Sequence, residues 1–256
     1  MPGPAWLIIP TYNEASNVEA IVEAALPVLA AAAPGGHRIL VVDDGSPDGT
    51  GALADGLAER HPGEVEVLHR PAKGGLGPSY LAGFARALGA GAGHVLEMDA
   101  DFSHSPADLG RLLGAAHDGA DLVLGSRYVD GGGVTEWHAL RRAISRGGCW
   151  YARRVLGLDV RDLTGGFKCF SAAALQAIDL PTVSAQGYAF QVELTFRVTR
   201  AGLRVVEIPI VFRERREGQS KMSAAIALEA VWRVPLLRLR ARRLRLAEPR
   251  ADAPAP

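Results

Sequence analysis

Two aspartates one residue apart, Asp99 and Asp101, directly follow the apolar run 94–98. If that run is a buried strand, both carboxylates lie on a turning backbone beyond its end, where they can reach one hard cation together. Mg²⁺ and Mn²⁺ take oxygen ligands and share their coordination shell with substrate phosphates, so the pair suits a bound diphosphate. The alternative is an acidic turn that caps the next helix, and the position at the end of a strand favours the metal.

Acidic and aromatic side chains follow two other apolar runs. Tyr12 and Glu14 come just after the first run of the chain, where an aromatic ring can pack against a nucleobase. Asp43 and Asp44 end the second run, and two adjacent acids stay charged more easily when ligand groups donate hydrogen bonds to them. A ribose diol or a base edge is such a partner. A turn held by Asx-type hydrogen bonds is the alternative for this segment.

Basic side chains gather at two places. Arg127 follows the run 122–124 and offers a planar fork of donors that suits a phosphate, with an ion pair to a local acid such as Asp130 as the alternative. A functional residue on the rim contributes little to packing, so Arg127→Ala is expected to leave the melting temperature nearly unchanged. A cluster broken by Gly218 resembles an anion-binding loop, although a solvated charge run explains it better when it is taken alone. Its members are Arg213, Arg215, Arg216 and Lys221.

Strand-length apolar runs alternate with longer helical patterns over the first 125 residues. The expected strands are 6–9, 38–42, 65–68, 94–98 and 122–124. Repeated strand–loop–helix units predict an α/β fold, with a Rossmann-like, mostly parallel sheet and helices on both faces. Such sheets bind ligands beyond the carboxyl ends of their strands. The acidic clusters and Arg127 fall at those ends, so one binding site on one rim is expected.

The second half of the chain is less regular. A turn is expected over 162–168, helices over 140–156 and 188–200, strand pieces over 204–212, and a terminal helix from about residue 223. The predicted organisation is a main domain over 1–221, a C-terminal helix over 222–246 and a disordered tail over 247–256.

Composition and charge narrow the class of protein. The chain has 256 residues with 28 basic and 28 acidic side chains, so its formal net charge is zero and no nucleic-acid partner is expected. Apolar residues make up 48% and charged residues 22%, which excludes a disordered chain, a fibrous repeat and a coiled coil. Cys149 and Cys169 build neither a disulfide scaffold nor a cysteine zinc site, so a reducing compartment is expected. No apolar run approaches the ~20 residues of a membrane span.

The C-terminal segment combines arginine with leucine. Seven Arg and one acid, Glu248, lie between Arg233 and Arg250. Trp232 and the stretch 234–246 could lie in a membrane interface, where each basic side chain near anionic lipid is worth ~1 kcal/mol. The apolar residues of that stretch do not form one clean helical stripe, so a solvated terminal helix is an equally good interpretation.

Six motifs occur in order along the chain. They are Ile9-Pro-Thr-Tyr-Asn-Glu14, Val42-Asp-Asp-Gly-Ser-Pro-Asp-Gly-Thr50, Gly75-Leu-Gly77, Met98-Asp-Ala-Asp-Phe-Ser-His104, Gly125-Ser-Arg-Tyr128 and Gly218-Gln-Ser-Lys221. Together they resemble the motifs of the polyprenol (dolichol) phosphate mannose synthases, which are inverting glycosyltransferases of the GT-A fold. The resemblance covers residues 7–221, and it is to the compact members that have no transmembrane extension.

The resemblance implies roles for individual residues. Nucleotide contacts fall to Pro10, Tyr12, Glu14, Val42 and Asp44. Asp99 and Asp101 would hold Mg²⁺ or Mn²⁺, with Ala100 lining the site. Arg127, Arg215 and Lys221 would engage the donor phosphates, and Arg127, Arg141 and Ser145 the acceptor phosphate. Asp101 and Arg127 would be the catalytic residues, while Ser103 stands where some members have a glutamine as a further metal ligand.

The expected function is transfer of mannose from GDP-mannose to a polyprenyl (dolichyl) monophosphate, with inversion. The enzyme would be cytoplasmic and peripheral on the cytoplasmic face of a membrane, with a membrane-protein partner left open. Rival interpretations are a transferase that uses UDP-glucose or another nucleotide-sugar, one with a protein or polysaccharide acceptor, and a non-catalytic nucleotide-binding regulator. A phosphoacceptor signalling domain would leave the Asp99–Asp101 pair and the basic loop unexplained.

Overall fold

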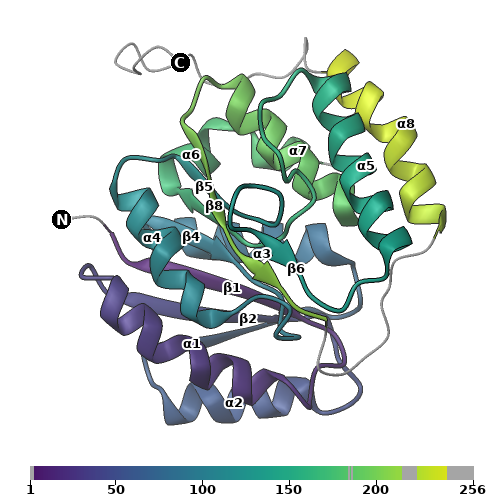
Figure 1. Cartoon of the computed structure of the whole chain (residues 1–256). Helices are drawn as coiled ribbons and strands as arrows, with labels where there is room; N and C mark the ends of the chain where they lie inside the picture. The colour runs from purple at the N-terminus through teal and green to yellow at the C-terminus, as the bar shows by residue number, and fades with distance from the viewer. Residues whose placement is uncertain (1–2, 184, 186, 215–223, 241–256) are drawn as a thin grey trace.

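The computed structural model describes residues 3–183, 185, 187–214 and 224–240 of the chain (Figure 1). Within these ranges a seven-stranded sheet has the order β3-β2-β1-β4-β7-β5-β8. Its strands are β1 (Ala5–Thr11), β2 (His37–Asp43), β3 (Val65–His69), β4 (His94–Glu97), β5 (Leu122–Ser126), β7 (Lys168–Ser171) and β8 (Val205–Pro209). Two short strands, β6 (Gly133–Val134) and β9 (Val211–Phe212), pair with each other. The mostly parallel sheet is confirmed, because in the seven-stranded sheet only β7 runs antiparallel, between β4 and β5.

Strand β7 is an element that the sequence patterns do not predict. The turn expected over 162–168 is wrong at its end, because Lys168 already begins the strand. Four residues that start with a lysine lack the apolar run that marks a buried strand. Its burial comes instead from the strands on either side, and Lys168, Cys169 and Phe170 are each 0% exposed.

Helices cover both faces of the sheet (Figure 1). One face carries α1 (Val18–Ala32), α2 (Thr50–Arg60) and α4 (Leu109–His117). The other carries α3 (Leu76–Gly89), α5 (Ala139–Leu156), α6 (Ala172–Ala177), α7 (Gly187–Arg200) and α8 (Ala224–Arg240). Short 3₁₀ turns occupy Pro106–Asp108 and Leu180–Thr182.

Strand β1 shows why the sheet needs cover on both sides. Its side chains alternate between the faces, so Leu7 and Ile9 enter the first core while Trp6 and Ile8 enter the second. A strand buried on both faces is apolar throughout, and this accounts for the continuous apolar run near the N-terminus. The polar residues that follow such a strand are the first that can reach solvent or a ligand.

The terminal helix α8 packs beside α5 (Figure 1). Val234 and Leu237 pack into the core, whereas Trp232, Leu236 and Leu239 lie on the exposed side of the helix. The helix thus has one apolar stripe facing inward and another facing outward, which is why its sequence shows no single stripe. No helix within the described ranges is both long and apolar enough to cross a bilayer. The tail over 247–256 lies outside the described residues, and the domain boundaries stay predictions.

Candidate active site

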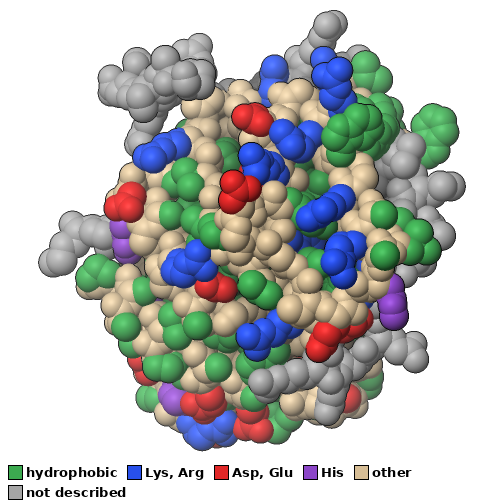
Figure 2. Space-filling model, in the orientation of Figure 1, with side chains coloured by type: hydrophobic (Ala, Val, Ile, Leu, Met, Phe, Trp, Pro, Cys, Tyr) green, Lys and Arg blue, Asp and Glu red, His purple; other side chains and the backbone are tan. Residues whose placement is uncertain are grey.

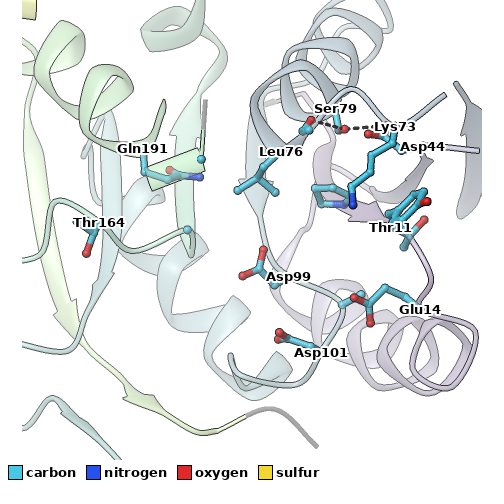
Figure 3. Close-up of a pocket in the computed structure, with 16 residues that line it drawn as sticks. Thr11, Glu14, Asp44, Lys73, Leu76, Ser79, Asp99, Asp101, Thr164 and Gln191 are labelled. Atoms are coloured by element: carbon cyan, nitrogen blue, oxygen red, sulfur yellow. Dashed lines mark hydrogen bonds between the residues drawn. The ribbon is translucent and has the colours of Figure 1, made fainter. Parts of the chain in front are cut away.

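A cavity of about 270 Å³ opens at the rim of the sheet, beyond the ends of β1, β2 and β4 (Figure 3). Seven of the residues singled out from the sequence line it. They are Pro10, Tyr12, Glu14, Asp44, Asp99, Ala100 and Asp101. Parallel neighbouring strands end at the same edge of a sheet, so segments that are far apart in the chain meet at one place.

The two aspartates follow β4 on a tight turn. Phe102, between Asp101 and Ser103, has a φ of 58°, a left-handed conformation that reverses the backbone there. Asp101 is 3% exposed, and its Oδ1 accepts hydrogen bonds from the main-chain N–H of Ser103 at 3.1 Å and from the Ser103 hydroxyl. Ser103 therefore orients the Asp101 carboxylate, and it does not line the cavity.

The donor set at this point fits a hard divalent cation. Asp99 and Asp101 place carboxylate oxygens at the middle of the cavity (Figure 3). The residues that the structure describes contain no group of three or more His, Cys, Asp or Glu that could enclose an ion. A cation here would complete its shell with oxygens of a bound ligand or of water, as Mg²⁺ does in phosphate-transfer sites.

The adjacent acids Asp43 and Asp44 have different roles. The Asp43 carboxylate accepts hydrogen bonds from the Ser46 main chain and hydroxyl at 3.1 and 2.5 Å, so it holds the turn after β2. Asp44 lines the cavity and accepts from Arg70 Nη1 at 2.5 Å and from the Ser79 hydroxyl at 2.8 Å. The turn interpretation thus applies to Asp43. Asp44 faces the cavity, and its Oδ2 also accepts a hydrogen bond from the main-chain N–H of Gly74 at 3.0 Å.

An aromatic ring and a lysine lie together near Asp44. Lys73 Nζ is 4.1 Å from the centroid of the Tyr12 ring, a cation–π contact, and both residues line the cavity. Glu14 accepts a hydrogen bond from Asn17 Nδ2 at 3.0 Å. On this side of the cavity the aromatic ring can stack on a base, the lysine can bind a phosphate, and the carboxylates can accept hydrogen bonds from a ribose diol. We call it the nucleotide side.

The opposite wall comes from residues that the sequence patterns do not single out. Thr164 and Gly166 precede β7, and Gln191 lies on α7. Beneath them Lys168 Nζ donates to the main-chain oxygen of Gln191 at 2.8 Å and to its Oε1 at 2.6 Å. No local motif marks these positions, because a strand and a helix from the second half of the chain bring them to the rim. We call this the far wall.

A buried acid and a buried base lie under the far wall. Glu97 on β4 and Lys168 on β7 are register partners, and both are 0% exposed. Burial raises the pKa of Glu97 to about 7, although the charge of Lys168 opposes that shift. Burial lowers the pKa of Lys168 to about 8, and the charge of Glu97 opposes that shift in turn. The two side chains thus limit the penalty that each would meet if it were buried alone.

Arg127 does not line the cavity, and its guanidinium is bound to another acid. Its Nε and Nη2 donate to the Asp162 carboxylate at 2.7 and 2.6 Å, and Nη2 also donates to the Thr164 hydroxyl at 2.9 Å. Although burial works against ionisation, the Arg127 charge and hydrogen bonds hold the pKa of Asp162 below its usual value. The ion pair that was the alternative role of Arg127 is therefore present, but its partner is Asp162 and not Asp130, which pairs with Arg161 at 3.5 Å. The premise that Arg127 packs little is contradicted, because its side chain is buried and held in the ion pair with Asp162.

Several other predicted residues lie away from the cavity. The Val42 side chain is in the core, so any nucleotide contact has to come from its main chain. On α5, Arg141 pairs with Glu214 at 2.8 Å, and Ser145 accepts a hydrogen bond from the Tyr128 hydroxyl at 2.6 Å. Arg215 and Lys221 lie outside the described residues.

A family model, "Glycosyl transferase family 2", matches residues 6–179. The chain belongs to this family. One relative of this family 2 glycosyltransferase is the polyprenol monophosphomannose synthase of Mycolicibacterium smegmatis, 49% identical over 89% of this chain and 84% of the relative. Another is the undecaprenyl-phosphate mannosyltransferase of Micrococcus luteus, 48% identical over 92% of this chain and 94% of the relative.

The fold of this glycosyltransferase also matches solved structures. Glucosyl-3-phosphoglycerate synthase of Mycobacterium tuberculosis, solved with Mn²⁺, UDP-glucose and phosphoglyceric acid, superposes with a TM-score of 0.66 at 17% identity. The match covers 92% of this chain and 79% of that one. A complex of the same enzyme with UDP gives a TM-score of 0.68 at 19% identity, over 92% of this chain and 80% of that one. These matches establish the GT-A-like fold expected from the sequence.

Proposed function

We propose that this glycosyltransferase transfers mannose from GDP-mannose to a polyprenyl (dolichyl) monophosphate, with inversion at the anomeric carbon. The carrying observation is a single cavity that joins Tyr12 and Asp44 on its nucleotide side to the Asp99–Asp101 pair. The names of the relatives at 48% and 49% identity support the choice of sugar and acceptor.

The proposed reaction needs little general acid–base catalysis from the protein. The acceptor phosphate is anionic at neutral pH, so its oxygen attacks the anomeric carbon without a strong general base. The bond from that carbon to the diphosphate breaks, GDP leaves with the electron pair, and one displacement inverts the centre. The chain then has to position the two phosphates and stabilise the developing charge.

The aspartate pair has the donor chemistry for Mg²⁺ or Mn²⁺. Asp99 and Asp101 would hold the ion, and when bound it would neutralise the charge of the departing diphosphate as a Lewis acid. Arg127 assists at the phosphates only through Nη1, because Nε and both N–H groups of Nη2 are already used. Arg215 and Lys221 are proposed for the donor phosphates, and Arg141 and Ser145 for the lipid phosphate.

One assay tests the function. The purified chain is incubated with polyprenyl phosphate in detergent, a divalent ion and a panel of nucleotide-sugars. GDP-mannose should be turned over, with release of GDP and formation of a lipid-linked mannose. Preferred use of UDP-glucose or another donor would replace GDP-mannose in the proposal. Binding of the donor without turnover would favour a nucleotide-binding regulator.

Asp101→Asn tests the metal. The variant keeps the shape of the side chain but loses a charged oxygen ligand, so turnover should fall by about 10²-fold or more while the melting temperature is retained. Asp118→Asn, at an exposed position after α4, is the matched control and should be fully active. A chelator should abolish wild-type activity, and a divalent ion should restore it. Full activity of Asp101→Asn in chelator would remove the metal from the mechanism.

We propose that the enzyme acts at a membrane surface. The surface formed by the exposed sides of α5 and α8, the α5–α8 face, would contact that membrane. Large apolar side chains on these two helices are exposed: Leu140 71%, Ile144 48%, Trp150 65%, Trp232 73%, Leu236 46% and Leu239 70%. Figure 2 shows basic side chains among the hydrophobic ones on this side of the molecule. Exposed tryptophan and leucine side chains can insert into the headgroup layer of a membrane, and the arginines beside them can bind anionic lipid there. The proposed membrane face is the cytoplasmic one.

Vesicle flotation tests this contact. Trp232→Ser combined with Leu239→Ser should weaken flotation with anionic vesicles severalfold, more so at low salt, and leave turnover of a short, detergent-soluble acceptor unchanged. Val211→Ser, at an exposed apolar position on β9, is the control. Unchanged flotation of the double variant would place docking on another surface or on a membrane-protein partner.

A further inference from the structure

The far wall of the cavity contains a buried amide whose orientation is determined by a lysine. Gln191 is 1% exposed and Lys168 is 0% exposed. Lys168 Nζ approaches Gln191 Oε1 at 2.6 Å, and an ammonium group only donates hydrogen bonds, so the amide atom that it meets is the oxygen. The second bond from Nζ, to the main-chain oxygen of Gln191 at 2.8 Å, keeps the lysine in that position. The amide N–H₂ therefore faces away from the lysine.

That N–H₂ group is buried and makes no hydrogen bond within the described residues. Glu97 lies beside it. Burial raises the pKa of Glu97, and the polar contact with the Gln191 amide opposes that shift, but neither Glu97 oxygen has hydrogen-bond geometry with any group of the described residues. Gly166 and Gln191 both line the cavity, and a Cβ built on Gly166 would be in ordinary van der Waals contact with Gln191 Nε2 at 3.5 Å. Figure 3 shows the Gln191 side chain extending toward the cavity. A buried donor without a partner costs about 1–3 kcal/mol, which makes the amide a position that a ligand acceptor would satisfy.

The layout of the cavity indicates which part of the donor reaches this amide. Figure 3 shows Gln191 and Thr164 on one side, Asp44 and Thr11 on the other, and Asp99 between them. With the nucleoside on the nucleotide side and the diphosphate at the aspartates, the group beyond the diphosphate lies at the far wall. In a nucleotide-sugar that group is the hexose, whose hydroxyl oxygens accept hydrogen bonds.

We propose that Gln191 is a specificity-determining residue that donates a hydrogen bond to one hydroxyl of the transferred hexose, and that Lys168 is the positioning residue that orients its amide. This inference rests on the proposed glycosyl transfer, but it needs only a hydroxylated hexose and is independent of which sugar is used. A site built to hydrogen-bond a hydroxyl rejects the analogue that lacks it, because the buried donor is then left unpaired. The amide thus selects the donor by one hydroxyl.

The test measures kcat/KM for the donor and for its monodeoxy analogues, each lacking one hydroxyl. The wild type should use one analogue about 10- to 100-fold less well than the donor, as expected for one buried hydrogen bond. Gln191→Met should lower kcat/KM for the natural donor by about the same factor. Its kcat/KM values for the donor and for that analogue should then be equal. Lys168→Met should also lose the discrimination, although Gln191 is still present. Gln176→Met, at an exposed position on α6, is the matched control and should keep the wild-type profile.

Binding of GDP and the melting temperature separate recognition from folding. GDP lacks the hexose, so its affinity for Gln191→Met should stay within about twofold of the wild-type value while kcat/KM falls. The inference is overturned if Gln191→Met folds and keeps the wild-type preference among the analogues, or if GDP binding falls as much as kcat/KM. Lack of wild-type turnover with GDP-mannose would instead overturn the proposed donor. In that case the deoxy series is built on the nucleotide-sugar that the enzyme does use.

Discussion

Arg127→Ala is expected to lower both the stability and the turnover of the enzyme, and the contacts of Asp162 determine the size of the first effect. Asp162 is 0% exposed and accepts three hydrogen bonds from Arg127, through the main-chain N, Nε and Nη2. Alanine keeps only the main-chain bond and leaves a buried carboxylate without its counter-charge. Breaking a buried ion pair on one side costs about 3–5 kcal/mol.

This loss of stability should lower the melting temperature substantially. At about 2–4 °C per kcal/mol for a domain of this size, the melting temperature should fall by roughly 6–20 °C. The loss should also depend on pH. The depressed pKa of Asp162 means that the pair stabilises the fold above the unfolded-state pKa near 4 and stops doing so as pH falls through the lower, folded-state value. The gap between wild type and Arg127→Ala should therefore narrow below about pH 4.

Thermal denaturation of three variants, each followed by the mannosyl-transfer assay, separates stability from catalysis. Arg127→Ala should be destabilised as above, while Arg127→Met combined with Asp162→Leu should recover most of the loss because no buried charge is left unpaired. If Arg127 Nη1 also contacts a phosphate, the double variant stays inactive despite its stability, and Arg127→Lys lowers kcat more than it raises KM for the lipid. An Arg127→Ala variant that melts at the wild-type temperature would refute the buried pair and leave the guanidinium free for phosphates.

Two further predictions concern the sheet and the helices that cover it. Burial, and then the charge of His117, lower the pKa of His94 below its usual value. Near pH 6 the unfolded chain therefore binds more protons at this histidine than the folded chain does. The free energy of unfolding consequently falls as pH drops through about 6.5. His94→Asn should reduce the fall in melting temperature between about pH 7 and pH 5, and parallel curves for the two proteins would contradict this. A Cβ on Gly83 of α3 would come 2.5 Å from Ile8 Cγ2, so Gly83→Ala should destabilise by about 1–3 kcal/mol in urea unfolding. A Cβ built on Gly89, at the end of the same helix, meets no heavy atom of the described residues within 4 Å apart from its own helix backbone and chain neighbours. Gly89→Ala should therefore be neutral or slightly stabilising, and equal effects of the two changes would contradict the packing argument.

Local patterns in the sequence were enough for the parallel strands and for the nucleotide side of the cavity. Side chains of a strand alternate between the faces, so a strand covered on both sides, such as β1, has to be apolar throughout and is visible as a run. Tyr12, Asp44 and the pair Asp99–Asp101 follow such runs directly. Their meeting at one rim then follows from the parallel topology.

The far wall and the partner of Arg127 depended on contacts between distant segments. Lys168 belongs to a short antiparallel strand that has no pattern of its own, and it reaches Gln191 only because β7 inserts between β4 and β5. Asp162 lies 35 residues beyond Arg127, and a nearer acid, Asp130, was as good a partner by charge alone. The charge of an acid does not indicate how far it lies from Arg127 in the folded chain. Side chains on elements with no local signature become neighbours only when the whole sheet has assembled, so tertiary structure alone decided them.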